Sequence, residues 1–250
     1  MNLRIVFLGT GAAVPGHRGL PCIAVRADST IYLLDVGEGC QGRLVRSGLS
    51  PLKVKAIFVT HMHGDHYWGL FGLLQTMHLN NRREPLVVVG PRELLTLMKY
   101  MLDERMLRLG FELNLEELNA SYKFNDGKVH VEAYPVCHNI EAYGFRLEFS
   151  RRTLSYTGDT KPCDSVVKNS EGVDLLIHEA TFTSESREEA IGQGHSTAAD
   201  AAISAAKANA KMLALTHISA RYRNSSEVFY DAYRYFDNVL VAQDYQVLYF

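Results

Sequence analysis

The sequence is poor in cysteine, and its four cysteines are scattered. Cys22, Cys40, Cys137 and Cys163 lie far apart and form no CxxC pair, and no signal-like segment precedes the first expected strand at residues 3–8. We therefore expect reduced thiols in a cytoplasmic protein.

Long apolar runs and an excess of one charge are also missing. No apolar run approaches the roughly 20 residues that a membrane helix needs, so we expect no membrane association. The formal net charge of −2 gives no global attraction to nucleic acid, so RNA binding would require a local basic patch. With 250 residues, 47% hydrophobic content and no linker or low-complexity tract, the chain is expected to form one domain over residues 1–250, with two halves of similar strand-then-helix character.

A nucleotide-binding fingerprint is incomplete. Gly9-Thr10-Gly11 follows the first expected strand, but a third glycine is missing and Pro15 would stop the helix that should receive a pyrophosphate. A nucleotide cofactor is therefore not expected, and these glycines are more typical of a tight turn.

What the sequence does contain is a concentration of metal-competent side chains. His61, His63, Asp65 and His66 follow the β-prone run 54–60, with a backbone turn at Gly64. This arrangement gathers four side chains around one small volume. An exposed histidine-rich loop is the alternative, but it would not explain the strand before the segment or the apolar helix start after it.

Histidines also end other expected strands. Of ten histidines, six lie at or just after the end of an apolar strand: His61, His63, His66, His138, His178 and His217. Strand ends at one edge of a sheet converge on a common cleft, so residues distant in sequence can meet there.

The count of donors favours two ions over one. Seven nitrogen and oxygen donors exceed the needs of one tetrahedral ion but suit two divalent ions that share a carboxylate. These donors are His61, His63, Asp65, His66, His138, Asp159 and His217. Asp159 suits the bridging role best, and the absence of cysteine ligands favours an open catalytic pair. The donors suit zinc first, and manganese or iron could also bind.

Three further residues have alternative interpretations. Asp35 could be a turn former, or it could orient a ligand histidine by accepting its second N–H. Cys137 could be a ligand or nucleophile, but we favour a small core residue at a strand end, because the adjacent His138 is the better candidate for a metal ligand. His178 is expected to form hydrogen bonds inside the site without binding metal.

The order of these motifs resembles the metallo-β-lactamase superfamily over nearly the entire chain. The segments His178-Glu179-Ala180-Thr181, Gly194-His195-Ser196-Thr197 and 216–222 resemble its ribonuclease Z branch, the transfer-RNA 3′-processing endonucleases. The resemblance implies an α/β fold, an αββα sandwich of two mixed sheets with helices outside and metals at one edge.

The resemblance also implies a role for each candidate. One ion would be held by His61, His63, His138 and Asp159, and the other by Asp65, His66, His217 and the same Asp159. Asp65 would also orient or deprotonate the attacking water. His195, aided by Glu179, would stabilise the scissile phosphate or protonate the leaving oxygen, although a histidine satisfying a helix start is the alternative. Asp35 would orient a metal-binding histidine.

The activity that the resemblance implies is removal of the 3′ trailer of precursor tRNA by a homodimer with two Zn²⁺ per subunit. Two departures bear on the substrate. The family's Pro-x-Lys-x-Arg-Asn loop is replaced by the sequence of residues 15–20, and the flexible arm that clamps tRNA is missing between Phe149 and Thr153. The sequence assigns no substrate-binding residues.

Another surface could bind RNA in place of the arm. The richest basic set lies on and before a helix expected over about 92–109, and comprises Arg82, Arg83, Arg92, Lys99, Arg105 and Arg108. Interspersed acidic residues favour a solvated helix face instead. A small-molecule hydrolase with the same metals, acting on phosphodiesters, lactones or sulfate esters, stays open as an alternative. A non-catalytic RNA-binding scaffold is a third, and the complete ligand set argues against it.

Overall fold

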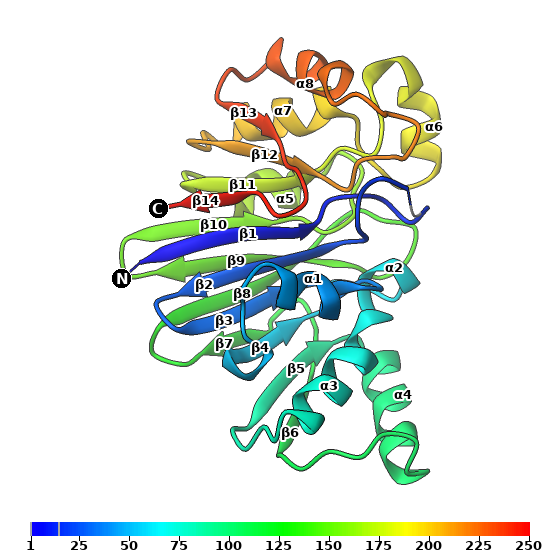
Figure 1. The fold of residues 1–250 in the computed structure, drawn as a ribbon. Helices are drawn as coiled ribbons and strands as arrows, with labels where there is room; N and C mark the ends of the chain where they lie inside the picture. The colour runs from blue at the N-terminus through cyan, green and yellow to red at the C-terminus, as the bar shows by residue number, and fades with distance from the viewer. Residues whose placement is uncertain (1, 15) are drawn as a thin grey trace. The chain divides into compact units, whose positions relative to one another are not determined.

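The computed structural model describes residues 2–14 and 16–250, and Figure 1 labels its helices and strands. The chain forms two compact units. Unit 1 comprises Met1–Gly9, Gly19–Leu118 and Asp244–Phe250, and unit 2 comprises Thr10–Arg18 and Asn119–Gln243. The expectation for Pro15 lies outside the described residues. The assignment of residues 1–250 to one domain stays a prediction.

Unit 1 is built on a seven-stranded mixed sheet. Neighbouring strands are antiparallel from β14 to β3 and parallel from β3 to β6. In spatial order the strands are β14 (Val247–Tyr249), β1 (Leu3–Gly9), β2 (Cys22–Ala27), β3 (Thr30–Leu34), β4 (Val54–Phe58), β5 (Leu86–Gly90) and β6 (Leu113–Glu117). The helices of the unit are α1 (Cys40–Arg46), η1 (Pro51–Lys53), α2 (Gly64–Tyr67), α3 (Gly69–Leu79) and α4 (Arg92–Asp103).

The core of unit 1 follows from its apolar pattern. Strand β5 is buried along its whole length, as expected of a parallel strand in the middle of a sheet. Helix α3 contributes Leu70, Leu73, Leu74 and Met77, whose i, i+3, i+4, i+7 spacing forms one buried stripe. Ile57 of β4 and Val59 just beyond it belong to the same core, and the histidine-rich segment follows them.

Unit 2 repeats this plan. Its strands are antiparallel from β7 to β10 and parallel from β10 to β13. In spatial order they are β13 (Val239–Val241), β12 (Leu213–Thr216), β11 (Leu175–Glu179), β10 (Arg152–Tyr156), β9 (Tyr143–Phe149), β8 (Val129–Pro135) and β7 (Lys123–Asn125). The helices are α5 (Asp164–Asn169), η2 (Ser184–Ser186), α6 (Arg187–Gly192), α7 (Ala198–Lys207) and α8 (Ser226–Tyr233). The predicted similarity of the two halves is confirmed.

Several element boundaries differ from the expectations. The helix expected over 92–109 ends at Asp103, because Arg105 has a left-handed φ of 56° and the chain turns back to bond Leu107 N–H to the carbonyl of Met101. Strand β11 continues through His178 and Glu179. Thr197 is the N-cap of α7 and forms a reciprocal capping box with Asp200.

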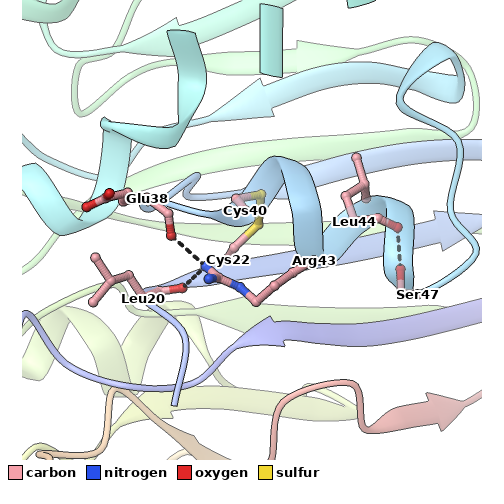
Figure 2. Close-up of a disulfide and its surroundings, with 7 residues drawn as sticks. All are labelled: Leu20, Cys22, Glu38, Cys40, Arg43, Leu44 and Ser47. Carbon is pink, nitrogen blue, oxygen red and sulfur yellow. Dashed lines mark hydrogen bonds between the residues drawn. A yellow bond between two sulfur atoms is a disulfide. The ribbon is translucent and has the colours of Figure 1, made fainter. Parts of the chain in front are cut away.

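The expectation of four reduced thiols is wrong for one pair. Figure 2 shows a disulfide between Cys22, the first residue of β2, and Cys40, the first residue of α1. Their Cα atoms are 6.0 Å apart, within the range that a disulfide spans, although 18 positions separate them in sequence. The packing of a helix start against a strand start brings them together, which sequence spacing does not reveal.

Among residues 2–14 and 16–250, no helix combines the length and the apolar character that a membrane-spanning helix requires.

Candidate metal centre

In unit 1 the histidine-rich segment leaves β4 and turns into the short helix α2. His61 and His66 are fully buried, and His63 is the N-cap residue of α2. A Cβ at Gly64 would lie 2.3 Å from the indole nitrogen of Trp68, so a larger residue at this turn would require the exposed Trp68 side chain to move. The tight turn places Asp65 and His66 beside the strand-end histidines.

Two pairs of donor atoms in this unit have the spacing of metal ligands. His61 Nε2 lies 3.1 Å from His63 Nδ1, and His66 Nε2 lies 3.5 Å from Asp65 Oδ2. Two ligands that bind one tetrahedral zinc ion at about 2.0–2.1 Å are roughly 3.3 Å apart. Unit 1 therefore contains two separate pairs of donor atoms, each with the spacing of two ligands of one ion.

A buried carboxylate and a hydroxyl orient these imidazoles. His66 Nδ1 donates to Asp35 Oδ2 at 2.8 Å, which is the contact that an orienting carboxylate makes. Asp35 also accepts from the backbone N–H of Thr60 at 2.8 Å and from its hydroxyl at 3.1 Å. The hydroxyl oxygen in turn accepts from His61 Nδ1 at 2.9 Å. The sequence analysis missed Thr60, because a threonine at a strand end carries no distinctive signal.

In unit 2 the candidate ligands follow the ends of three strands. His138 lies beyond β8, Asp159 beyond β10 and His217 beyond β12. His217 Nε2 lies 3.4 Å from Asp159 Oδ1, again the spacing of two ligands of one ion. His138 Nδ1 donates to the carbonyl of Gly194 at 2.7 Å, so its lone pair is on Nε2.

Asp159 also lies in a wider group with His195. One donor atom from each of Asp159, His195 and His217 falls within 4.8 Å of the others. The imidazoles of His195 and His217 stack with ring centroids 5.4 Å apart. The structure thus brings His195 to the same part of unit 2 as two of the predicted ligands.

The buried carboxylate of Glu179 forms hydrogen bonds that position this group. It is fully buried, and its Oε1 accepts from His195 Nδ1 at 2.7 Å and from the N–H of Thr160 at 3.0 Å. Its Oε2 accepts from the hydroxyl of Thr181 at 2.7 Å. Burial acts to raise the pKa of Glu179, but the charge and hydrogen bond of His195 outweigh it and hold this pKa below its usual value. Glu179 is therefore a carboxylate.

Thr181 is a second residue that the sequence analysis missed. Because its hydroxyl donates to Glu179, the oxygen accepts the N–H of His217 Nδ1 at 2.8 Å. The lone pair of His217 is consequently on Nε2, the atom nearest Asp159.

Two residues from the sequence analysis remain to be placed in the structure, His178 and Cys137. His178 is buried in β11 and its Nδ1 donates to the carbonyl of Glu179 at 2.7 Å, while burial lowers its pKa and keeps it neutral. Within the described residues it belongs to no group of candidate ligands. Cys137 is half-buried, so the prediction of a core residue is wrong: β8 ends at Pro135 and the chain leaves the sheet before the cysteine.

One residue of the candidate basic surface is buried. Arg82 is only 3% exposed, and its guanidinium donates to the carbonyls of Leu52, Val54, Glu84 and Pro85. The expectation of a surface cation at this position is therefore wrong. Arg83, Arg92, Lys99, Arg105 and Arg108 are exposed.

The fold and these strand-end residues correspond to a known class. A family model described as the beta-lactamase superfamily domain matches residues 32–218. The metallo-beta-lactamase fold protein YhfI from Bacillus subtilis superposes with a TM-score of 0.88 at 19% identity, covering 100% of this chain and 99% of its own. The predicted fold class, the α/β architecture of that superfamily, is confirmed.

Two relatives of higher sequence identity show the family within this superfamily. A ribonuclease Z of Sulfurisphaera tokodaii is 34% identical, and the match covers 96% of each chain. The short form of human tRNase Z superposes with a TM-score of 0.86 at 32% identity, covering 98% of each chain. The chain belongs to the ribonuclease Z family of the beta-lactamase superfamily.

Proposed function

We propose that the protein is a metal-dependent endoribonuclease that removes the 3′ trailer of precursor tRNA and leaves a 3′-hydroxyl. The observation that carries this proposal is the match to ribonuclease Z over 96% of the chain at 34% identity. The proposal extends to a homodimer, as the resemblance implies, and to a location in the cytoplasm.

The proposed metal centre uses the ligands that the resemblance implies. One Zn²⁺ would be bound by His61, His63, His138 and Asp159, and the other by Asp65, His66, His217 and the same Asp159. The donor-atom spacings of 3.1, 3.4 and 3.5 Å within the units support this assignment, because each joins two ligands assigned to one ion. Histidine and carboxylate donors suit zinc, and manganese and iron accept the same donors.

The chemistry divides between the ions and the protein. Two bound ions would neutralise charge on the phosphoryl oxygens and supply a nucleophilic water near neutral pH. Asp65 would orient that water and accept its proton. His195, whose Nδ1–H is held by the carboxylate of Glu179 at 2.7 Å, would donate from Nε2 to the departing 3′ oxygen.

A second candidate function is hydrolysis of a small phosphodiester, lactone or sulfate ester. Two observations favour it. Strands β9 and β10 are joined by Ser150 and Arg151 alone, so no RNA-clamping arm is inserted there. Arg18, in the altered loop, donates hydrogen bonds to Thr10, Ala242 and Ser225 within unit 2. Its guanidinium is therefore engaged inside the protein.

The test is cleavage of a 3′-extended precursor tRNA beside a chromogenic phosphodiester, with zinc-loaded and chelator-treated protein. We expect one cut near the discriminator base, lost on metal removal, and affinity that falls steeply with salt because phosphate contacts release counterions. Intact RNA together with rapid, metal-dependent turnover of the small diester would establish the second function instead.

The contact of Asp35 leads to a separate prediction. In an Asp35→Asn variant we expect the zinc dissociation constant to rise about 10–100-fold, because His66 loses the carboxylate that fixes its orientation. Competition with a chromophoric chelator measures the constant. Asp28→Asn, an exposed aspartate that follows β2, is the matched control. Unchanged zinc affinity in a folded Asp35→Asn protein would show that the carboxylate serves only the turn.

A further inference from the structure

The one tryptophan of the chain, Trp68, is exposed beside the candidate ligands of unit 1. It is 54% exposed, and it follows His63, Asp65 and His66 within a few positions. A single exposed apolar side chain is common on protein surfaces and needs no special explanation. Its position and the way it is held therefore decide what this indole can bind.

Two helices fix the backbone of Trp68. The residue is the C-cap of α2 and the N-cap of α3, and its φ of −58° and ψ of −26° are helical. Its N–H donates to the carbonyl of Gly64 at 3.0 Å. Helix α3 is anchored in the core of the unit by Leu70 and Leu73. The direction in which the Trp68 side chain leaves the backbone is therefore set by the fold.

The indole itself is held by two rings and by the turn. Its centroid lies 4.8 Å from that of Tyr67 and 6.0 Å from that of Phe71, separations typical of interacting aromatic pairs. The interplanar angles of 33° and 51° mean that neither ring stacks flat on it. Its Nε1 and Cδ1 lie against Gly64, where they leave no room for a Cβ. Because the indole is already restrained, a ligand that stacks on it costs less side-chain entropy.

The turn that the indole lies against carries the donor atoms. Gly64 stands between His63 and Asp65, which belong to the two separate donor pairs of the unit. A phosphodiester bound at these donors has a nucleoside on either side, so a base of the same strand lies next to the turn. A protein partner would instead need a continuous apolar patch, and the turn presents the polar groups of His63 and Asp65. The position therefore favours a nucleobase as the occupant.

We propose that Trp68 is a stacking platform for one nucleobase of single-stranded RNA, next to the phosphodiester that is cut. This inference rests on the proposed function and names a contact of its substrate. Unpaired bases stack on aromatic side chains, and the contact tolerates any base because every base has a π face. Trp68 touches the base and not the reacting atoms. Its contact is the same before and during cleavage, so its loss should affect KM more than kcat.

The fluorescence of the single tryptophan tests this contact directly. Zinc-loaded wild-type protein is mixed with 3′-extended precursor tRNA in a stopped-flow instrument, and cleavage is followed in quenched samples of the same mixture. A base stacked on an indole quenches its emission, so we expect the emission to fall as the RNA binds and before it is cut. N-acetyltryptophanamide mixed with the same RNA corrects for the light that the RNA absorbs.

Two substitutions of Trp68 give an independent measurement. Trp68→Leu keeps an apolar side chain without a ring, and should raise KM for precursor tRNA about 10-fold while kcat changes less than about threefold. Trp68→Phe keeps a ring and should restore most of the wild-type KM. Both variants should bind as much zinc as the wild type. Tyr249→Leu removes an exposed ring from β14 of the same unit, and as the matched control should leave KM unchanged.

The outcomes separate this inference from the proposed function. Cleavage of the RNA with unchanged emission refutes the stacking contact and leaves the function in place, and so does a wild-type KM in Trp68→Leu. An equal rise of KM in Trp68→Phe also refutes it, because loss of the ring could not be the cause. RNA that stays uncut overturns the proposed function and this inference with it. The emission measurement uses wild-type protein, so it decides the question even where a variant fails to fold.

Discussion

Replacing Asp159 with alanine should reduce kcat/KM for precursor tRNA by at least about 10³-fold and lower the zinc content from two ions per chain to one or none. Asp159 is 2% exposed, and its Oδ1 lies 3.4 Å from His217 Nε2. The proposed centre uses this carboxylate for both ions, so its removal affects both at once. Atomic absorption and single-turnover cleavage measure the two effects.

Asp237→Ala is the matched control for this variant. Asp237 is an exposed aspartate of unit 2 that follows α8, and its loss should change neither the zinc content nor the rate. An Asp159→Ala protein that binds two zinc ions and cuts at the wild-type rate would remove Asp159 from the centre.

Replacing Arg82 with methionine should lower the free energy of unfolding by about 3 kcal/mol. Methionine keeps an unbranched apolar stem, but the buried carbonyls that the guanidinium serves lose their donor. The donor–acceptor distances are 2.7 Å to Glu84, 2.8 Å to Val54 and 2.9 Å to Pro85. Because this side chain ties residues 52–54 to residues 84–85, its loss loosens the starts of β4 and β5.

Arg83 offers a control one position along the chain. It is exposed, so Arg83→Met should change the free energy of unfolding by less than about 0.5 kcal/mol. Urea unfolding followed by circular dichroism measures both variants. Equal stabilities for the two would mean that the buried hydrogen bonds of Arg82 contribute little, and the Arg82 variant should in any case keep its activity per folded molecule.

The sequence predicted best the features that depend on local pattern. The sequence Asn-Asp-Gly-Lys at 125–128 is typical of the hairpin turn that joins β7 to β8, and Thr197 has a residue type typical of the N-cap that it forms on α7. Both depend on turn or cap chemistry within a few residues. The histidine-rich segment was found for the same reason, since an apolar strand followed by a turn is visible in the sequence itself.

Features that depend on distant packing were not predictable in this way. The disulfide of Cys22 and Cys40 requires a helix start to meet a strand start. The burial of Arg82 requires carbonyls from two separate segments to face one guanidinium. In the sequence, a basic residue near acidic neighbours is typical of an exposed position. Thr60 and Thr181 were missed because a hydroxyl gains its role only from the carboxylate and imidazole beside it.

These two threonines determine the tautomers of two candidate ligand histidines. Each hydroxyl stands between a buried carboxylate and an imidazole, Thr60 between Asp35 and His61, and Thr181 between Glu179 and His217. A carboxylate can only accept, so the hydroxyl must point its hydrogen there and offer its oxygen to the ring N–H. A side chain that never titrates thus decides which ring nitrogen carries the proton. These hydrogen bonds favour the tautomer with the proton on Nδ1, for His61 in unit 1 and for His217 in unit 2, and leave the Nε2 lone pair of each ring to accept.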